Sequence, residues 1–152
     1  MEERVEGPYP FIPFEPVEHT ADLAFVARGR TLTELFTHAA QGMVAFLYDR
    51  ATVEPREEER IEIMGEDAEE LLVAWLQEIL YRHEMRRHLY REFRVESAAP
   101  PRLVGSVHGE LFDPGRHEIL AHIKAATYHD LAIVTEMTAA GPLLRVRVVL
   151  DT

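Results

Sequence analysis

The chain has 152 residues, of which 47% are hydrophobic, and its 27 acidic and 16 basic residues give a formal net charge of −11. A chain of this length is expected to form one domain, spanning 1–152, around a single core. It has no cysteine, which excludes disulfides and thiolate metal sites and leaves oxygen or imidazole as metal ligands. The negative charge argues against independent binding of nucleic acid, because Lys and Arg supply most non-specific affinity for phosphates. The sequence shows no apolar stretch of signal-peptide or membrane-spanning length, so we expect a cytoplasmic protein without a membrane partner.

The first part of the chain predicts extended structure followed by a helix. The stretch 7–16 interleaves prolines with aromatic residues and is expected to be extended. Alternating apolar residues predict a short strand over 23–28. A helix is predicted over 32–47, because Thr31 and Glu34 form a capping-box pattern ahead of apolar residues at helical spacing.

The middle of the chain predicts a loop, a strand and a second helix. The charged run 54–60 is typical of a solvated loop, and a strand is expected to begin at Ile61. The second helix is predicted to begin after Asp67 and to end near His83. The basic stretch 82–91 could bind an anion, although the preference of helix C-termini for cations explains it equally well.

Beyond residue 90 the apolar residues alternate with a period of two, which predicts strands. The predicted strands are 93–95, 103–107, 119–125, 131–137 and 143–150. Two helices followed by a run of strands indicate an α+β fold, a two-layer sandwich of a mainly antiparallel β-sheet with two α-helices.

Three short segments combine ionisable groups that could carry chemistry. The segment 18–22 precedes a strand and is equally typical of a turn, and 113–117 has the Pro and Gly of a tight turn. In 124–129, Lys124 has small neighbours and could bind a phosphate or neutralise carboxylates, or it could be an ordinary exposed lysine. The candidate site residues from these segments are His19, Asp22, Asp113, His117, Lys124 and His129.

The last predicted strand runs up to Asp151 and Thr152, which places carboxylates at its end. Asp22, Asp151 and the terminal carboxylate of Thr152 could hold a hard divalent cation such as Ca²⁺, Mg²⁺ or Mn²⁺, because these ions prefer oxygen ligands. Lys124 would then offset part of the repulsion among the acids. The residues can meet only if the first and last strands are neighbours.

Histidines offer a second possible metal site. His117, His122 and His129 could bind zinc if all three converged, since zinc sites generally need at least three protein ligands. The sequence has no phosphate-binding glycine-rich loop, no GxSxG nucleophile elbow and no HExxH motif. These three short signatures of nucleotide binding and hydrolysis are therefore missing from the chain.

Taken in order, the motifs resemble those of the archease family, and the resemblance covers almost the whole chain. The motifs are His19-Thr20-Ala21-Asp22, the leucine-rich stretch 71–81 with Trp75-Leu76, Asp113 with Arg116-His117, Lys124-Ala125-Ala126-Thr127-Tyr128-His129, and Val149-Leu150-Asp151. Each motif alone is weak, whereas the ordered set is specific.

The resemblance implies a small α+β protein that is not itself an enzyme. Archeases are accessory proteins of the RtcB-type RNA ligase, which joins RNA ends during tRNA splicing and RNA repair. They promote guanylylation of the ligase, so that it turns over repeatedly, and RNA and GTP are engaged only through the ligase. The metal-binding acids and the functional lysine of the family match Asp22, Asp151 and Lys124.

Two functions of other classes remain open on the residues alone. The same carboxylates could serve a stand-alone metal-dependent phosphohydrolase, although no second metal cluster or nucleophile is evident. An acidic protein-binding module of chaperone type would need no metal at all.

Overall fold

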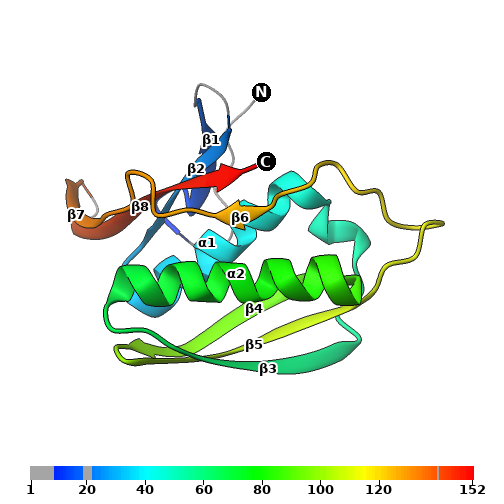
Figure 1. The fold of residues 1–152 in the computed structure, drawn as a ribbon. Helices are drawn as coiled ribbons and strands as arrows, with labels where there is room; N and C mark the ends of the chain where they lie inside the picture. Colours follow the sequence, from blue (N-terminus) through cyan, green and yellow to red (C-terminus); the bar gives the residue numbers. More distant parts are fainter. Residues whose placement is uncertain (1–8, 19–21, 140) are drawn as a thin grey trace.

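The computed structural model describes residues 9–18, 22–139 and 141–152, and in it two α-helices lie between two β-sheets (Figure 1). Both helices pack against strands of both sheets. The elements in chain order are β1 Phe14–Val17, β2 Leu23–Gly29, α1 Leu32–Leu47, the 3₁₀ helix η1 Arg50–Thr52, β3 Glu57–Met64, α2 Ala68–Arg86, β4 His88–Ala99, β5 Arg102–Leu111, β6 Ala125–Ala126, β7 Ile133–Thr138 and β8 Gly141–Asp151.

The larger sheet has the strand order β1-β2-β8-β6, with β7 also paired to β8, and the smaller sheet has the order β3-β5-β4. Every pairing between the described strands is antiparallel. The α+β class, the two helices and the antiparallel pairing are therefore confirmed. The single sheet of a two-layer sandwich is corrected to two sheets with the helices between them. Period-two alternation identifies strands, but it does not say which strands pair.

The helix ends follow the predicted caps. Thr31 Oγ1 accepts the N–H of Glu34 at 3.2 Å, and α1 covers the predicted span. Asp67 accepts the N–H of Glu70 at 2.8 Å at the start of α2. The second helix runs three residues beyond the predicted His83 and ends where Arg87 adopts a left-handed conformation, with φ of 55°. Neither helix in the described part of the chain has the length and apolar character of a membrane span.

Two segments differ from their predicted structure. Residues 57–60, predicted as loop, form the first half of β3, because this edge strand pairs with β5 and can leave charged side chains in solvent. Residues 119–124, predicted as strand, have no strand structure, and only Ala125–Ala126 pairs with β8. Instead, the backbone N–H of Leu120 donates to the Leu47 carbonyl at 2.8 Å. This bond holds residues 119–124 against the end of α1.

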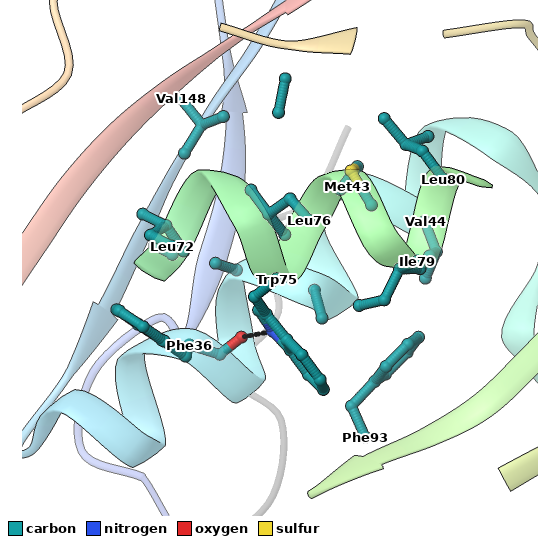
Figure 2. Close-up of a cluster of buried hydrophobic side chains, with 14 of the residues drawn as sticks. Phe36, Met43, Val44, Leu72, Trp75, Leu76, Ile79, Leu80, Phe93 and Val148 are labelled. Atoms are coloured by element: carbon teal, nitrogen blue, oxygen red, sulfur yellow. Dashed lines mark hydrogen bonds between the residues drawn. The ribbon is translucent and has the colours of Figure 1, made fainter. Parts of the chain in front are cut away.

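Trp75 of α2 joins the layers of the core. Its side chain is completely buried, and its Nε1–H donates to the carbonyl of Phe36 in α1 at 3.0 Å (Figure 2). The ring also lies against the backbone of β5, since a methyl group at Gly105 would come within 3.2 Å of it. One large side chain thus links both helices and the smaller sheet.

Tyr48, at the end of α1, satisfies both backbone groups of one residue in β4. Its hydroxyl donates to the carbonyl of Tyr90 at 2.8 Å and accepts the N–H of Tyr90 at 2.7 Å. Burial raises the pKa of Tyr48 well above the usual range, so the hydroxyl keeps its proton.

Replacing Tyr48 with phenylalanine is expected to lower the free energy of unfolding by about 1–3 kcal/mol, because two buried backbone groups lose their partner. Urea unfolding measures the change. Tyr128→Phe, at an exposed tyrosine, is the matched control and should shift stability by less than about 0.5 kcal/mol. Equal effects of the two substitutions would contradict the assignment.

Candidate functional site

The end of β8 brings the predicted acids and lysine together at one edge of the larger sheet. β8 lies between β2 and β6, with Leu23 opposite Leu150 and Ala125 opposite Asp151. Asp22, which directly precedes Leu23, therefore lies beside Asp151. The N–H of Lys124 donates to the Asp151 carbonyl at 2.8 Å. Segments from both halves of the sequence thus meet where the chain reaches its C-terminus (Figure 1).

The carboxylates and the lysine lie on different sides of this edge. Leu150 is buried and Leu23 packs against the same core, so the residues that follow and precede them, Asp151 and Asp22, belong to the outer face of the sheet. Lys124 instead lines a groove of about 610 Å³ together with Leu80 and Tyr81 of α2. The backbone of Lys124 is thus bonded to that of Asp151, whereas the Lys124 side chain lies beside α2.

The two aspartates supply oxygen ligands at an accessible position. Asp151 and Thr152 are exposed, and Asp22 is partly exposed. The described residues contain no group of three or more His, Asp or Glu side chains that could hold a metal, and His19 lies outside the described residues. Two carboxylates with waters suit a hard cation such as Ca²⁺ or Mg²⁺ better than zinc, which takes three or more protein ligands.

The histidines do not form a zinc site within the described residues. His117 is buried, whereas His122 and His129 are exposed. His129 Nε2 lies 3.3 Å from a carboxylate oxygen of the exposed Asp130, and the backbone N–H of His129 donates to Thr127 Oγ1 at 3.2 Å. The hypothesis of a site formed by His117, His122 and His129 is therefore not supported.

His117 and Asp113 belong to a hydrogen-bonded loop built around Glu110, a residue that the sequence analysis missed. His117 Nδ1 accepts the N–H of Asp113 at 2.8 Å, so the ring proton is on Nε2, which lies 2.9 Å from Glu110 Oε2. Arg116 donates to both Glu110 oxygens, at 3.0 and 2.7 Å, and the N–H of Glu54 donates at 2.8 Å. These bonds give His117 and Asp113 a structural role in the loop that follows β5.

Arg116, with Glu54 and His117, holds the pKa of the nearly buried Glu110 at about 2, well below its usual 4.5. Because the folded-state pKa is lower than the unfolded one, the stabilisation is present above about pH 4.5 and is lost as the pH falls towards 2.

Glu110→Gln should therefore destabilise the protein by about 1–3 kcal/mol at neutral pH, since it removes the charge from a nearly buried carboxylate that accepts hydrogen bonds from Arg116, His117 and Glu54. The difference from wild type should shrink as the pH approaches 2. Urea unfolding at several pH values measures it, with the exposed Glu58→Gln as control. A difference that does not change with pH would contradict the ionised role of Glu110.

The protein is thus an α+β domain with two aspartates and a lysine at one end of the larger sheet. Comparison with known proteins shows which family has this sequence and fold. The model of the Archease protein family matches residues 14–152. The protein is 38% identical to the archease of Methanopyrus kandleri over 82% of this chain and 91% of that one, and 38% identical to the archease of Methanothermobacter thermautotrophicus over 91% and 97%. The chain belongs to the archease family.

Solved structures agree with this placement. The solution structure of Methanobacterium thermoautotrophicum protein 1598 is similar over 92% of this chain and 99% of that one, with 35% identity and a TM-score of 0.76. The crystal structure of a Thermotoga maritima archease, described as a possible chaperone, is similar over 91% of this chain and 96% of that one, with 21% sequence identity and a TM-score of 0.57. At this identity the similarity supports the fold alone.

Proposed function

We propose that this protein is an accessory activator of an RtcB-type RNA ligase, promoting guanylylation of the ligase and its repeated turnover in tRNA splicing and RNA repair. Its membership of the archease family supports the proposal. The observation that carries it is the register of β2, β8 and β6, which brings Asp22, Asp151 and Lys124 to one sheet end. RNA and GTP are engaged only through the ligase.

In this proposal, Asp22 and Asp151 bind a divalent cation, Ca²⁺ or else Mg²⁺ or Mn²⁺, and Thr152 supplies a further oxygen donor. The ion, when bound, supplies positive charge that can neutralise phosphate oxygens. The exposure of Asp151 and Thr152 leaves this edge open to a partner. The net charge of −11 favours fast association with a basic surface of the ligase.

Lys124 has a separate role in this proposal, because its side chain lines the α2 groove. It contacts an anionic group of the ligase complex and does not hold the cation. Lys124→Gln is expected to reduce ligase stimulation about tenfold, the effect of one lost electrostatic contact, while cation affinity measured by calorimetry changes little. A parallel loss of cation affinity would contradict the separate roles.

The proposal is tested by multiple-turnover ligation with the ligase from the same cell, with and without this protein. The RNA substrate carries a 2′,3′-cyclic phosphate and a 5′-hydroxyl. We expect many ligations per ligase molecule only when the protein is present, and an unchanged product yield would overturn the proposal. Product released from nucleotides or phosphorylated RNA ends by the protein alone would indicate a phosphohydrolase instead. Stimulation that persists in a metal chelator would favour a metal-free chaperone module.

A further inference from the structure

We propose that a hollow at the edge of the smaller sheet binds a phosphate group. It has a volume of about 260 Å³ and is lined by Arg50, Arg91 and Arg94, together with Gln41, Glu92, Phe93 and His108. Its walls come from α1, η1, β4 and β5. It is therefore separate from the Asp22 and Asp151 edge, which belongs to the larger sheet.

A β-bulge in β4 positions one of the arginines. The register passes from Tyr90 opposite Gly109 to Glu92 opposite His108, so Arg91 has no partner residue in β5. Bulges of this kind redirect a side chain and are frequent beside binding sites. Here the bulge sets Arg91 at the junction of β4 with η1.

The side chains of Arg50 and Arg91 are both held by backbone carbonyls at the contact between η1 and β4. Arg50 Nη1 donates to the Arg91 carbonyl at 3.1 Å, and Arg91 Nη1 donates to the carbonyls of Ala51 and Val53 at 3.4 and 3.2 Å. A guanidinium has five N–H donors, and both of these bonds from Arg91 start at Nη1. The donors on Nε and Nη2 of Arg91 take no part in them. The two side chains are thus held in place before a ligand arrives, which lowers the entropy cost of binding.

Charge and size indicate the class of ligand. Among the described residues, neither Arg91 nor Arg94 forms an ion pair, whereas Arg82 of the same basic stretch is bound by Glu59 and Glu78. Two guanidinium groups, those of Arg91 and Arg94, against the single carboxylate of Glu92 leave an excess of positive charge in a chain of net charge −11. Guanidinium forks match phosphate oxygens in geometry, and the volume suits a phosphate or pyrophosphate better than a drug-sized molecule.

The test titrates the full-length protein with inorganic phosphate and, separately, pyrophosphate at constant ionic strength, followed by NMR shifts of the arginine side chains. Arg94→Gln is the test variant, because the side chain of Arg94 is exposed and forms no hydrogen bond or ion pair with the described residues. We expect it to weaken binding about tenfold, the effect of losing hydrogen bonds to a charged group. Arg102→Gln, an exposed arginine of β5 paired with Glu62, is the matched control and should bind as wild type does.

Binding of either probe that Arg94→Gln weakens and Arg102→Gln leaves unchanged supports the site. Saturation by one probe alone identifies whether a single phosphate or a diphosphate is the preferred group. The absence of binding by both probes at millimolar concentration, or equal weakening by the two substitutions, overturns it. The measurement uses the protein without the ligase, so its outcome is independent of the activator function.

Discussion

Replacing Trp75 with alanine is expected to lower the free energy of unfolding by about 3–5 kcal/mol, the usual cost of removing a large buried aromatic side chain. Trp75 of α2 contacts the other helix and the smaller sheet: it donates to Phe36 of α1, lies against Gly105 of β5 and is completely buried. Its loss would leave a cavity where the two helices meet the smaller sheet (Figure 2). Thermal or urea unfolding measures the change.

Two further substitutions separate the packing of Trp75 from its hydrogen bond. Trp75→Phe keeps an aromatic ring but removes the hydrogen bond from Nε1–H to the carbonyl of Phe36, so we expect an intermediate loss of about 1–3 kcal/mol. Met85→Ala removes an exposed apolar side chain from the same helix and should change stability by less than about 0.5 kcal/mol. A Trp75→Ala protein as stable as Met85→Ala would contradict the position of the ring in the core.

Replacing Asp151 with asparagine is expected to lower the affinity for Ca²⁺ by about 10-fold to 100-fold, because one of two carboxylate ligands is lost while the shape of the side chain is kept. Asp22→Asn should have a similar effect. Since the two acids lie side by side on β2 and β8, we expect the double variant to lose little more than either single variant. Calorimetry with Ca²⁺, Mg²⁺ and Mn²⁺ measures the affinities.

Asp130→Asn is the matched control for these variants. Asp130 is an exposed acid before β7, and its φ of 53° suits asparagine as well as aspartate. It should therefore keep wild-type affinity and wild-type stability. Fully additive effects of Asp22→Asn and Asp151→Asn would contradict a shared cation, and an equal loss in Asp130→Asn would indicate a general effect of negative charge.

The helices could be predicted from the sequence because their signals are local. Thr31 and Asp67 cap their helices through bonds to residues three positions ahead, and both were correctly identified. The strand partners depend on contacts across the whole chain, which is why the division into two sheets was not foreseen. The run 57–60 was mistaken for a loop because an edge strand tolerates charges that are otherwise typical of solvated turns.

In the candidate site, too, local motifs could be read from the sequence, whereas contacts between distant residues could not. The resemblance proposes Asp22, Lys124 and Asp151 as site residues, and the condition that the first and last strands be neighbours is met by the pairing of β2 with β8. The role of Glu110 could not be read from the sequence, because its partners come from a distant loop and from the turn after β5. The hollow at Arg91 was equally hidden, since it depends on a bulge in the register of β4.

The central claim of the proposed function is that Asp22 and Asp151 together act on the ligase. The decisive measurement is the transfer of guanylate from GTP to the ligase, with wild-type protein and with the Asp22→Asn/Asp151→Asn double variant, after unfolding curves have shown that the variant is folded. We predict that wild-type protein accelerates the transfer and that the double variant leaves it at the rate of the ligase alone. Acceleration by the double variant equal to that of the wild type would contradict the account.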